Sequence, residues 1–254
     1  MRNGNLIFKL VVLGFLLVIA SSCSKDNDSE PSNPTNGHTT AVFNPKLKYG
    51  SMTDQDGNTY RTITIGTQTW MAENLRTTKY RNGDAITNVT GNAQWGSTTS
   101  GAYCYYNNTN SLDTIALLGG LYNWYAVSDN RSIAPKGWHV PSEGEWNTLV
   151  AYLGGDSIAG YKMKQAPFIE WDGALWIGID HIADNSSGFT ANPGGWRWFD
   201  TGRYVWVCYD GAWWAVTECG VPYAGVLFLE YFESAVTKIC NYKGNGYSVR
   251  CIRD

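Results

Sequence analysis

The chain has 254 residues and a formal net charge of −3, from 19 Lys and Arg against 22 Asp and Glu. Surfaces that follow nucleic-acid phosphates need clustered Lys and Arg. The basic residues here are scattered along the sequence, so we expect no nucleic-acid partner. No internal repeat, charge block or second linker interrupts residues 49–254, a length that suits one sizeable domain.

The first 22 residues have the organisation of a lipoprotein signal peptide. Arg2 and Lys9 give a basic start, and residues 10–20 (LVVLGFLLVIA) form an apolar run. Such a run is too short to cross about 30 Å of hydrocarbon but is typical of a signal-peptide h-region. Small residues lead to Cys23, as in a bacterial lipobox; a buried N-terminal element with a chance cysteine is the alternative. We expect removal of residues 1–22, acylation of Cys23 and attachment to a membrane through this lipid.

Residues 23–48 are rich in Ser, Asn, Asp, Pro and Thr, with few residues able to build a core. This composition predicts a flexible tether. Its acidic beginning, residues 24–28 (SKDND), looks like the surface-export signals of Bacteroidetes lipoproteins, with ordinary linker charge as the alternative. We therefore expect a protein of the outer membrane, lipid-anchored and displayed at the cell surface.

The remaining chain contains patterns of both strands and helices. Residues 60–65 (YRTITI) alternate β-forming residues, and the turn residues 66–68 separate them from Trp70 and Met71, which predicts a β-hairpin. A helix is predicted from about Glu143 to Leu153, with Ser142 as N-cap and Glu145 in the capping-box position. Its apolar residues at 146, 149, 150 and 153 should face the core. A second short helix is predicted around residues 121–127, and β-prone runs follow at 204–209, 213–217 and 247–252. The predicted class is α+β with much irregular chain.

Seven ordered motifs resemble a known family. They are NTYRTITIGTQTWMAENLR, YCYYNN, GLYNWYAV, PKGWHVPSEGEWNTLVAYLGG, SGFTANPGGWR, WWAVTE and GNGYSVRCIRD. In this order they look like the Fibrobacter succinogenes major paralogous domain, which is itself similar to C-type lectins and formylglycine-generating enzymes. The resemblance implies a single C-type-lectin-like domain over residues 49–254, with two short helices and small antiparallel sheets. It also implies that Trp196, Trp213 and Trp214 are core residues.

Five cysteines remain if Cys23 is lipidated, so at least one thiol stays unpaired within the chain. Cys104 and Cys251 sit at cysteine positions of the family and are the disulfide candidates in an oxidising compartment. A third family cysteine is Ala134 here, which puts the usual pairing in doubt.

Residues 198–242 depart from the family pattern, because bulky residues replace small polar ones. Several of them can arise from an AAC codon by changes at adenine, so we hypothesise diversification by a retroelement; ordinary divergence is the alternative. Exposed aromatic side chains suit a binding face for a protein or a glycan. The candidate ligand-binding residues are Trp198, Asp200, Tyr204, Trp206, Tyr209, Asp210, Tyr223, Glu230, Tyr231 and Glu233.

Catalytic and metal-binding patterns are missing from the sequence. It contains no HExxH, GxSxG, P-loop or dinucleotide-binding glycine motif, and its three His are far apart. We therefore expect no cofactor, no metal site and no enzymatic activity. The expected function is ligand binding by a surface lipoprotein. A structural or adhesin component of the envelope is the alternative, and an enzyme comes third.

Overall fold

The computed structural model describes residues 33–166, 176 and 183–254, and the statements below concern these residues. They all belong to one compact unit, residues 31–254. Cys23 and the predicted signal peptide lie outside the described residues. No helix in the described part of the chain is both long enough and apolar enough to span a bilayer.

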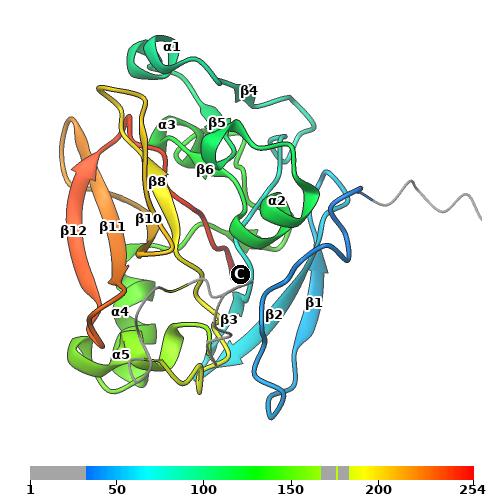
Figure 1. Ribbon diagram of the computed structural model, residues 1–254, viewed down its shortest axis with the longest axis vertical. Coiled ribbons are helices and arrows are strands. Elements are labelled where there is room, and N and C mark those ends of the chain that lie inside the picture. Colours follow the sequence, from blue (N-terminus) through cyan, green and yellow to red (C-terminus); the bar gives the residue numbers. More distant parts are fainter. Residues whose placement is uncertain (1–32, 167–175, 177–182) are drawn as a thin grey trace, which may run out of the picture. The chain divides into compact units, whose positions relative to one another are not determined.

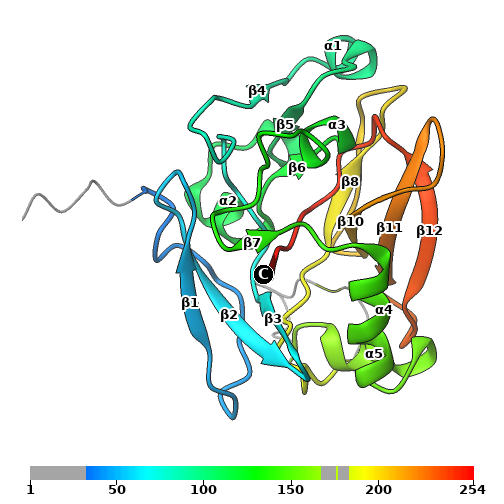
Figure 2. The same cartoon turned by 180° about the vertical axis from the view of Figure 1, so that it is seen from behind.

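The predicted hairpin is confirmed and forms the centre of a five-stranded sheet. Strands β2 (Thr59–Ile65) and β3 (Gln68–Met71) pair antiparallel, with Ile65 opposite Gln68. β1 (Gly50–Thr53) joins the free side of β2, and the last strand, β13 (Ile252–Arg253), lies between β3 and β7 (Trp138–His139). Figure 2 shows the C-terminus in this position. The sheet therefore joins the first strands of the domain to its last one.

The C-terminal third forms a second sheet of three antiparallel strands. Its order is β10 (Asp210–Glu218), β11 (Tyr223–Glu230) and β12 (Thr237–Tyr242). The hairpin of β8 (Gly194–Arg197) and β9 (Tyr204–Val207) lies beside β10. Figure 1 shows these strands in yellow to red. A third small sheet joins β4 (Thr87–Asn88), β5 (Ala102–Cys104) and β6 (Leu121–Tyr122), with β4 and β5 parallel.

The predicted helix at residue 143 is confirmed as α4 (Glu143–Tyr152), with Leu153 as its C-cap. Ser142 Oγ accepts a hydrogen bond from the Glu145 amide, and Glu145 Oε2 accepts one from the Ser142 amide at 2.8 Å. Trp146 and its predicted partners at 149, 150 and 153 are buried. The helix α5 (Asp156–Met163) follows almost at once, because Gly154 and Gly155 turn the chain with positive φ values.

The second predicted helix is only half right. Residues 121–122 are strand β6, and Asn123 then caps the single-turn helix α3 (Trp124–Val127) by accepting a hydrogen bond from the Ala126 amide at 3.1 Å. An Asn that bonds to nearby backbone favours a cap over a helix interior. Four further helical elements were not predicted: α1 (Asn92–Ser97), the 3₁₀ turn η1 (Tyr106–Asn108), α2 (Leu112–Leu118) and α5. The expectation of two short helices is therefore wrong for the described chain.

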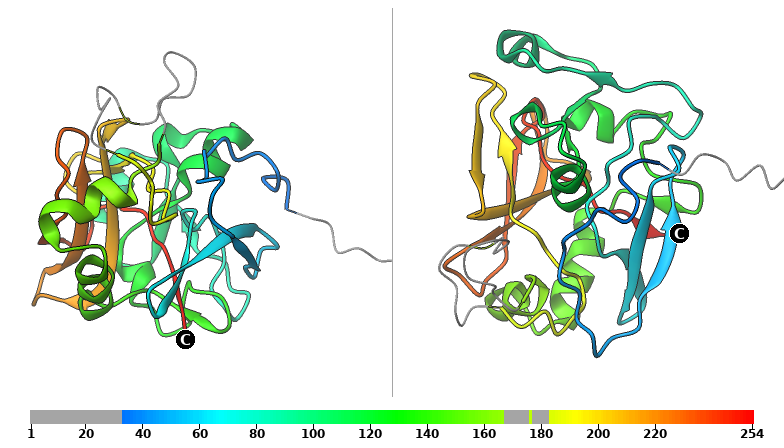
Figure 3. Two further views of the ribbon diagram at one scale, coloured as in Figure 1. Left: turned by 90° about the horizontal axis from the view of Figure 1, so that it is seen from below. Right: turned by 45° about the vertical axis from the view of Figure 1, so that its right-hand side comes forward.

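The core is rich in aromatic residues, and Trp196, Trp213 and Trp214 are buried in it as expected. On the side of α4, the rings of Trp70 and Trp146 lie 4.6 Å apart. Figure 3 shows α4 and α5 from below, beside the strands of the second sheet. Residues of both helices share one hydrophobic cluster with Trp213, Leu227 and Leu229 of the second sheet, so the helices pack against one side of it.

The prediction of a flexible tether is wrong for residues 33–48. Asn36 Nδ2 donates to the carbonyl of Gly57 at 2.9 Å, the Val42 amide donates to Gln165 Oε1 at 3.0 Å, and Asn44 Nδ2 donates to the carbonyl of Asn185 at 3.0 Å. Phe43 also packs against the core. Composition suggested a tether because these residues are polar, but their side chains satisfy backbone groups of the domain. The domain therefore includes residue 33 and does not begin at 49; residues 23–32 lie outside the described part.

The fold is mixed α and β, with few helices and several small, mostly antiparallel sheets in the described chain. This agrees with the predicted α+β class.

Candidate functional site

The structure divides the ten candidate ligand residues between two ends of the second sheet. Strand β11 has 8 residues, so at about 3.3 Å per residue its ends lie roughly 25 Å apart. Tyr223 begins the strand and Glu230 ends it. Glu230 pairs with Asp210, the first residue of β10, whereas Tyr223 pairs with Tyr242 at the far end. The two ends are therefore too far apart for one small-molecule site.

Aromatic rings form a continuous row near the Glu230 end. We define the aromatic row as Trp206, Tyr209, Tyr231 and Phe232. Successive ring centroids are 6.0 Å apart for Trp206 and Tyr209, 5.2 Å for Tyr209 and Tyr231, and 5.0 Å for Tyr231 and Phe232. All three contacts are edge-to-face, a favourable arrangement for aromatic pairs. The row thus joins the turn after β9 to the turn after β11.

The two ends of the aromatic row face solvent. Trp206 is 51% exposed and Phe232 is 52% exposed, while Tyr209 and Tyr231 are half-buried between them. Trp206 stacks on the buried ring of Trp196, with centroids 6.4 Å apart. Trp198 contacts the same ring from another side at 5.8 Å and is half-buried. Trp198 therefore packs against Trp196, the ring on which Trp206 stacks, and is less available than Trp206 for contact with a ligand.

The backbone of the turn after β9 is in an uncommon conformation. Trp206 has φ of 62° and Cys208 has φ of 70°, both in the left-handed region that bulky residues rarely occupy. The turn is closed by a hydrogen bond from the Tyr209 amide to the carbonyl of Trp206 at 3.1 Å, and the Cys208 amide donates to Pro193 at 3.0 Å. Strain of this kind clusters at functional sites, so it supports a functional role for this turn.

Helix α5 holds the other turn, residues 231–236. The Tyr161 amide donates to the carbonyl of Ser234 at 3.0 Å. Gly160 lets the two backbones approach closely, because a Cβ there would lie 2.6 Å from the carbonyl oxygen of Ala235. Lys164, which follows the helix and is fully buried, donates hydrogen bonds from Nζ to the carbonyl oxygens of Glu230 and Glu233. These contacts fix the turn that carries Tyr231 and Phe232.

Asp210 is not a surface residue, so its prediction as a ligand contact is wrong. Only 8% of it is exposed. Burial raises the pKa of Asp210 to about 6, the charge of Glu230 adds to this rise, and Lys164 opposes it. Burial also lowers the pKa of Lys164 to about 8, against the effect of Asp210, Glu230 and Glu233. The charges of Asp210 and Lys164 thus affect each other close to the turn that carries Tyr231 and Phe232.

Tyr204 is held as part of the scaffold. Its hydroxyl donates to Asn108 Oδ1 at 2.7 Å, its ring lies 5.3 Å from that of Tyr106, and the Arg197 guanidinium lies 4.7 Å from the ring centroid. A side chain with these three contacts is not free to meet a ligand.

Tyr223 and Asp200 are exposed but lie outside the aromatic row. Tyr223 is 43% exposed and meets Tyr242 edge-to-face, and Tyr242 stacks on Phe199 with centroids 4.0 Å apart. Asp200 is at the tip of the β8–β9 hairpin, where it accepts a hydrogen bond from the Thr201 amide. These residues belong to a separate cluster at the other end of the sheet.

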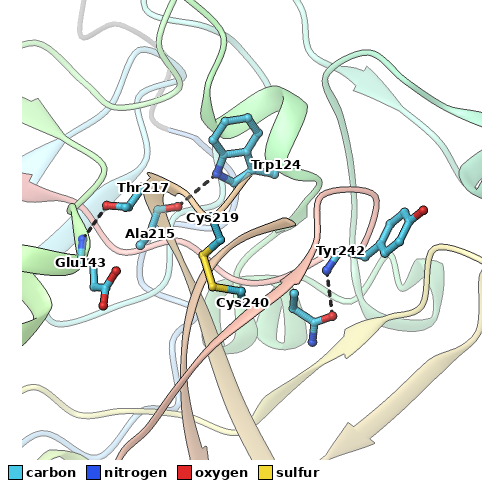
Figure 4. The surroundings of a disulfide bond; sticks show 8 residues. Trp124, Glu143, Ala215, Thr217, Cys219, Cys240 and Tyr242 are labelled. Carbon is cyan, nitrogen blue, oxygen red and sulfur yellow. Dashed lines mark hydrogen bonds between the residues drawn. A yellow bond between two sulfur atoms is a disulfide. The ribbon is translucent and has the colours of Figure 1, made fainter. Parts of the chain in front are cut away.

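A disulfide at that far end joins Cys219 to Cys240 (Figure 4). It connects the turn between β10 and β11 to strand β12. The prediction of Cys104 and Cys251 as disulfide residues is wrong: both are unpaired and fully buried, in different core clusters. Burial raises the pKa of both thiols. Cys208, in the strained turn, is also unpaired and is half-buried.

The described residues contain no group of three His, Cys, Asp or Glu placed to hold a metal ion. His139 bonds to two carboxylates, Asp254 Oδ1 and Glu145 Oε1, each at 2.7 Å. It thereby ties β7 to the C-terminal residue and to the start of α4.

Sequence reasoning missed two residues of the site, Phe232 and Lys164. Phe232 is part of the bulky, family-atypical stretch, and that signal could have selected it. No local signal marks Lys164, because its partners are 66 and 69 positions away in the sequence.

Comparison with known proteins gives one match. A family model described as the Fibrobacter succinogenes major domain matches residues 63–253, which include the whole aromatic row. No curated protein and no solved structure matches the chain.

Proposed function

Since the chain belongs to the Fibrobacter succinogenes major domain family, we propose that it is a lipid-anchored envelope protein that binds an extracellular ligand through the aromatic row. The observation that carries this proposal is the row itself: two half-exposed rings at its ends, joined by edge-to-face contacts and placed on two braced turns.

The anchor is the acyl group on Cys23, with residues 1–22 as the removed signal peptide. The location is the outer membrane, with the domain at the cell surface. This part of the proposal is supported by the basic start, the apolar run and the acidic residues that follow Cys23.

The domain has a C-type-lectin-like fold. This assignment is supported by the ordered family motifs and by β13, which returns to lie between β3 and β7. It is also supported by the irregular turns that present the aromatic row, because such folds carry binding residues on loops over a rigid scaffold.

The ligand is a protein in preference to a glycan. Rings that meet edge-to-face offer projecting edges and grooves, not one flat platform for sugar stacking. Trp and Tyr dominate the energetics of protein interfaces because they bring large contact area at small entropic cost. Glu230 and Glu233 flank the row, so a partner with basic residues around an apolar centre suits it.

The test is binding by the purified domain to envelope-protein arrays and glycan arrays. Trp206→Ala and Phe232→Ala should each reduce binding to the identified ligand by at least about tenfold, the size of an interface hot spot. Tyr152→Ala is the matched control, because Tyr152 is 66% exposed and lies outside the aromatic row.

If the row variants bound the ligand as well as the control does, the ligand-binding surface would lie outside the aromatic row. A single fixed envelope partner that co-purifies with the wild type and with both variants would favour the structural or adhesin alternative.

A further inference from the structure

Strand β12 is the outermost strand of the second sheet. It pairs antiparallel with β11 on one side, and no other strand of the described chain pairs with it on the other side. Figures 1 and 2 show β12 on the outer side of β11, away from β10. The open edge of a sheet presents unpaired N–H and C=O groups, to which another extended chain can bind.

The direction of the backbone groups in β12 follows from its hydrogen bonds. The Lys243 amide donates to the carbonyl of Pro222 at 3.0 Å, so the backbone of Lys243 points towards the chain of β11. This direction alternates from residue to residue along an antiparallel strand. Residues at odd positions of β12 therefore point their backbone groups towards β11, and those at even positions point them outward. The outward amide of Tyr242 donates instead to Asn241 Oδ1 at 2.8 Å.

Lys238 and Cys240 are the other two outward residues of β12, and their outward backbone groups have no hydrogen-bond partner within the described residues. A lysine often protects such an edge. Here, however, Lys238 Nζ lies 2.7 Å from Asp156 Oδ1 and donates to Asn147 Oδ1 at 2.9 Å. Cys240 is held by its disulfide to Cys219. Both side chains are therefore tied to their own domain, and the backbone groups stay available.

Ile239 lies between these two residues, on the opposite face of the strand, because side chains alternate between faces. It is 39% exposed, and Thr237 on the same face is also exposed. The open edge thus has an apolar side chain at its centre.

The edge is complementary to a second copy of itself. Two β12 strands can pair antiparallel about a two-fold axis at Ile239, as in an isologous dimer. Lys238 of each copy then lies opposite Cys240 of the other, and each of these two pairs can exchange both of its backbone hydrogen bonds. Ile239 lies opposite its own equivalent at the close, non-hydrogen-bonded position. This register uses every free backbone group and places no like charges directly opposite each other.

We propose that β12 is the interface of a symmetric dimer, in which two copies of this chain join their second sheets edge to edge. The result is one continuous sheet with three strands from each copy. The interface is independent of the aromatic row, since no residue of the row belongs to β12.

The first experiment is disulfide trapping of the full-length protein in intact cells that express it. All variants carry Cys208→Ser, which removes the partly accessible thiol. In the proposed register, the Cα atoms of the two residues at position 239 lie about 4.5 Å apart, within the range of a disulfide. After mild oxidation with copper phenanthroline, Ile239→Cys should therefore run mainly as a covalent dimer on a non-reducing gel.

Thr237→Cys is the matched control, because Thr237 is exposed on the same face of β12. It lies opposite Asn241 of the other copy, so two cysteines at position 237 are separated by four positions along the strand, at least about 13 Å. This variant should stay monomeric on the gel.

The second experiment needs no new thiol. Ile239→Lys places two ammonium groups directly opposite each other, which destabilises the pairing. In sedimentation equilibrium of the purified full-length protein in detergent, the wild type and the control Thr237→Lys should have twice the protein mass of one chain. Ile239→Lys should have the mass of one chain.

The proposal is overturned if the wild type sediments as a monomer or if Ile239→Lys sediments as the wild type does. It is also overturned if the two cysteine variants cross-link to the same extent. Trapping of Ile239→Cys with a different protein would overturn it as well, because the edge would then bind another chain and not a second copy.

Discussion

Two glycines in neighbouring helices have opposite roles. Gly160 in α5 faces the carbonyl oxygens of Ser234 and Ala235, 2.7 and 2.6 Å from an added Cβ. Overpacking of this kind costs about 1–3 kcal/mol, while the gain in helix propensity is about 1 kcal/mol. We expect Gly160→Ala to lower the free energy of unfolding by up to about 2 kcal/mol in urea titration.

Gly144 in α4 is the matched control. A Cβ there meets no atom closer than 3.8 Å, so Gly144→Ala should raise the free energy of unfolding by up to about 1 kcal/mol. If both variants changed stability in the same direction, the close approach of α5 to the 231–236 turn would be incorrect.

His139 makes stability depend on pH. Burial alone would lower its pKa, but the hydrogen bonds to Asp254 and Glu145 raise the pKa above its ordinary value. The folded state therefore holds the proton more tightly than the unfolded chain, whose histidine pKa is about 6.5. This contribution is complete below about pH 6.5 and is lost as the pH rises through the folded-state pKa.

The check is the melting temperature of the wild type and of His139→Gln at several pH values between 6 and 9. The difference between the two proteins should be largest at the acidic end and should shrink as the pH rises. A difference that stays constant over this range would mean that the imidazolium makes no contribution.

At the scale of single residues, the family motifs predicted the buried tryptophans correctly, whereas the exposure of an acidic residue was predicted wrongly. Trp196 and Trp213 were assigned to the core from their motifs and are buried. Asp210 is predicted as a ligand contact, but it is buried, and of its two charged neighbours Lys164 favours its ionised form while Glu230 opposes it. Such a balance depends on distant segments, so no local pattern reveals it.

At the scale of elements, the disulfide links the turn after β10 to strand β12, at the end of the second sheet where Tyr223 lies. Cys219 and Cys240 are 21 positions apart, and closing a loop of that length stabilises a fold by about 3 kcal/mol in the chain-entropy model. We expect the double variant Cys219→Ser with Cys240→Ser to lose about that much stability in urea titration.

A reducing agent should destabilise the wild type and leave the double variant unchanged. Cys208→Ser is the control, because Cys208 is unpaired and should show no such dependence on the reducing agent. Identical unfolding of the wild type with and without reductant would contradict the pairing.

The elements that were predicted best are those whose start or turn is determined by residues a few positions apart in the sequence. The capping box of Ser142 and Glu145 fixes the start of α4, and a short turn fixes the β2–β3 hairpin. The segment 33–48 was misread, because its polar side chains could not be matched to backbone partners more than 20 positions away. Within the stretch 198–242, residues 224–229 of β11 are buried, so this part of the stretch does not belong to a ligand face. Any diversification would thus act on the exposed turns.

At the scale of the whole molecule, the proposed lipid on Cys23 predicts that the protein is found in the membrane fraction. Cys23→Ala removes the acceptor of the lipid, so we expect the variant to leave the membrane fraction and appear in the soluble fraction after cell disruption. Radiolabelled fatty acid should be incorporated into the wild type only. A variant that still sedimented with membranes would contradict the lipid anchor.

The thiol of Cys208 lies in the strained turn of the aromatic row, while the other unpaired thiols of the described chain, Cys104 and Cys251, are fully buried. Among the described residues, Cys208 is therefore the one unpaired thiol that is partly accessible, and it lies at the proposed binding face. A membrane-impermeant maleimide added to intact cells would label this position only when the domain faces outward. The same reaction, slowed by a bound partner, would report occupancy of the face in living cells.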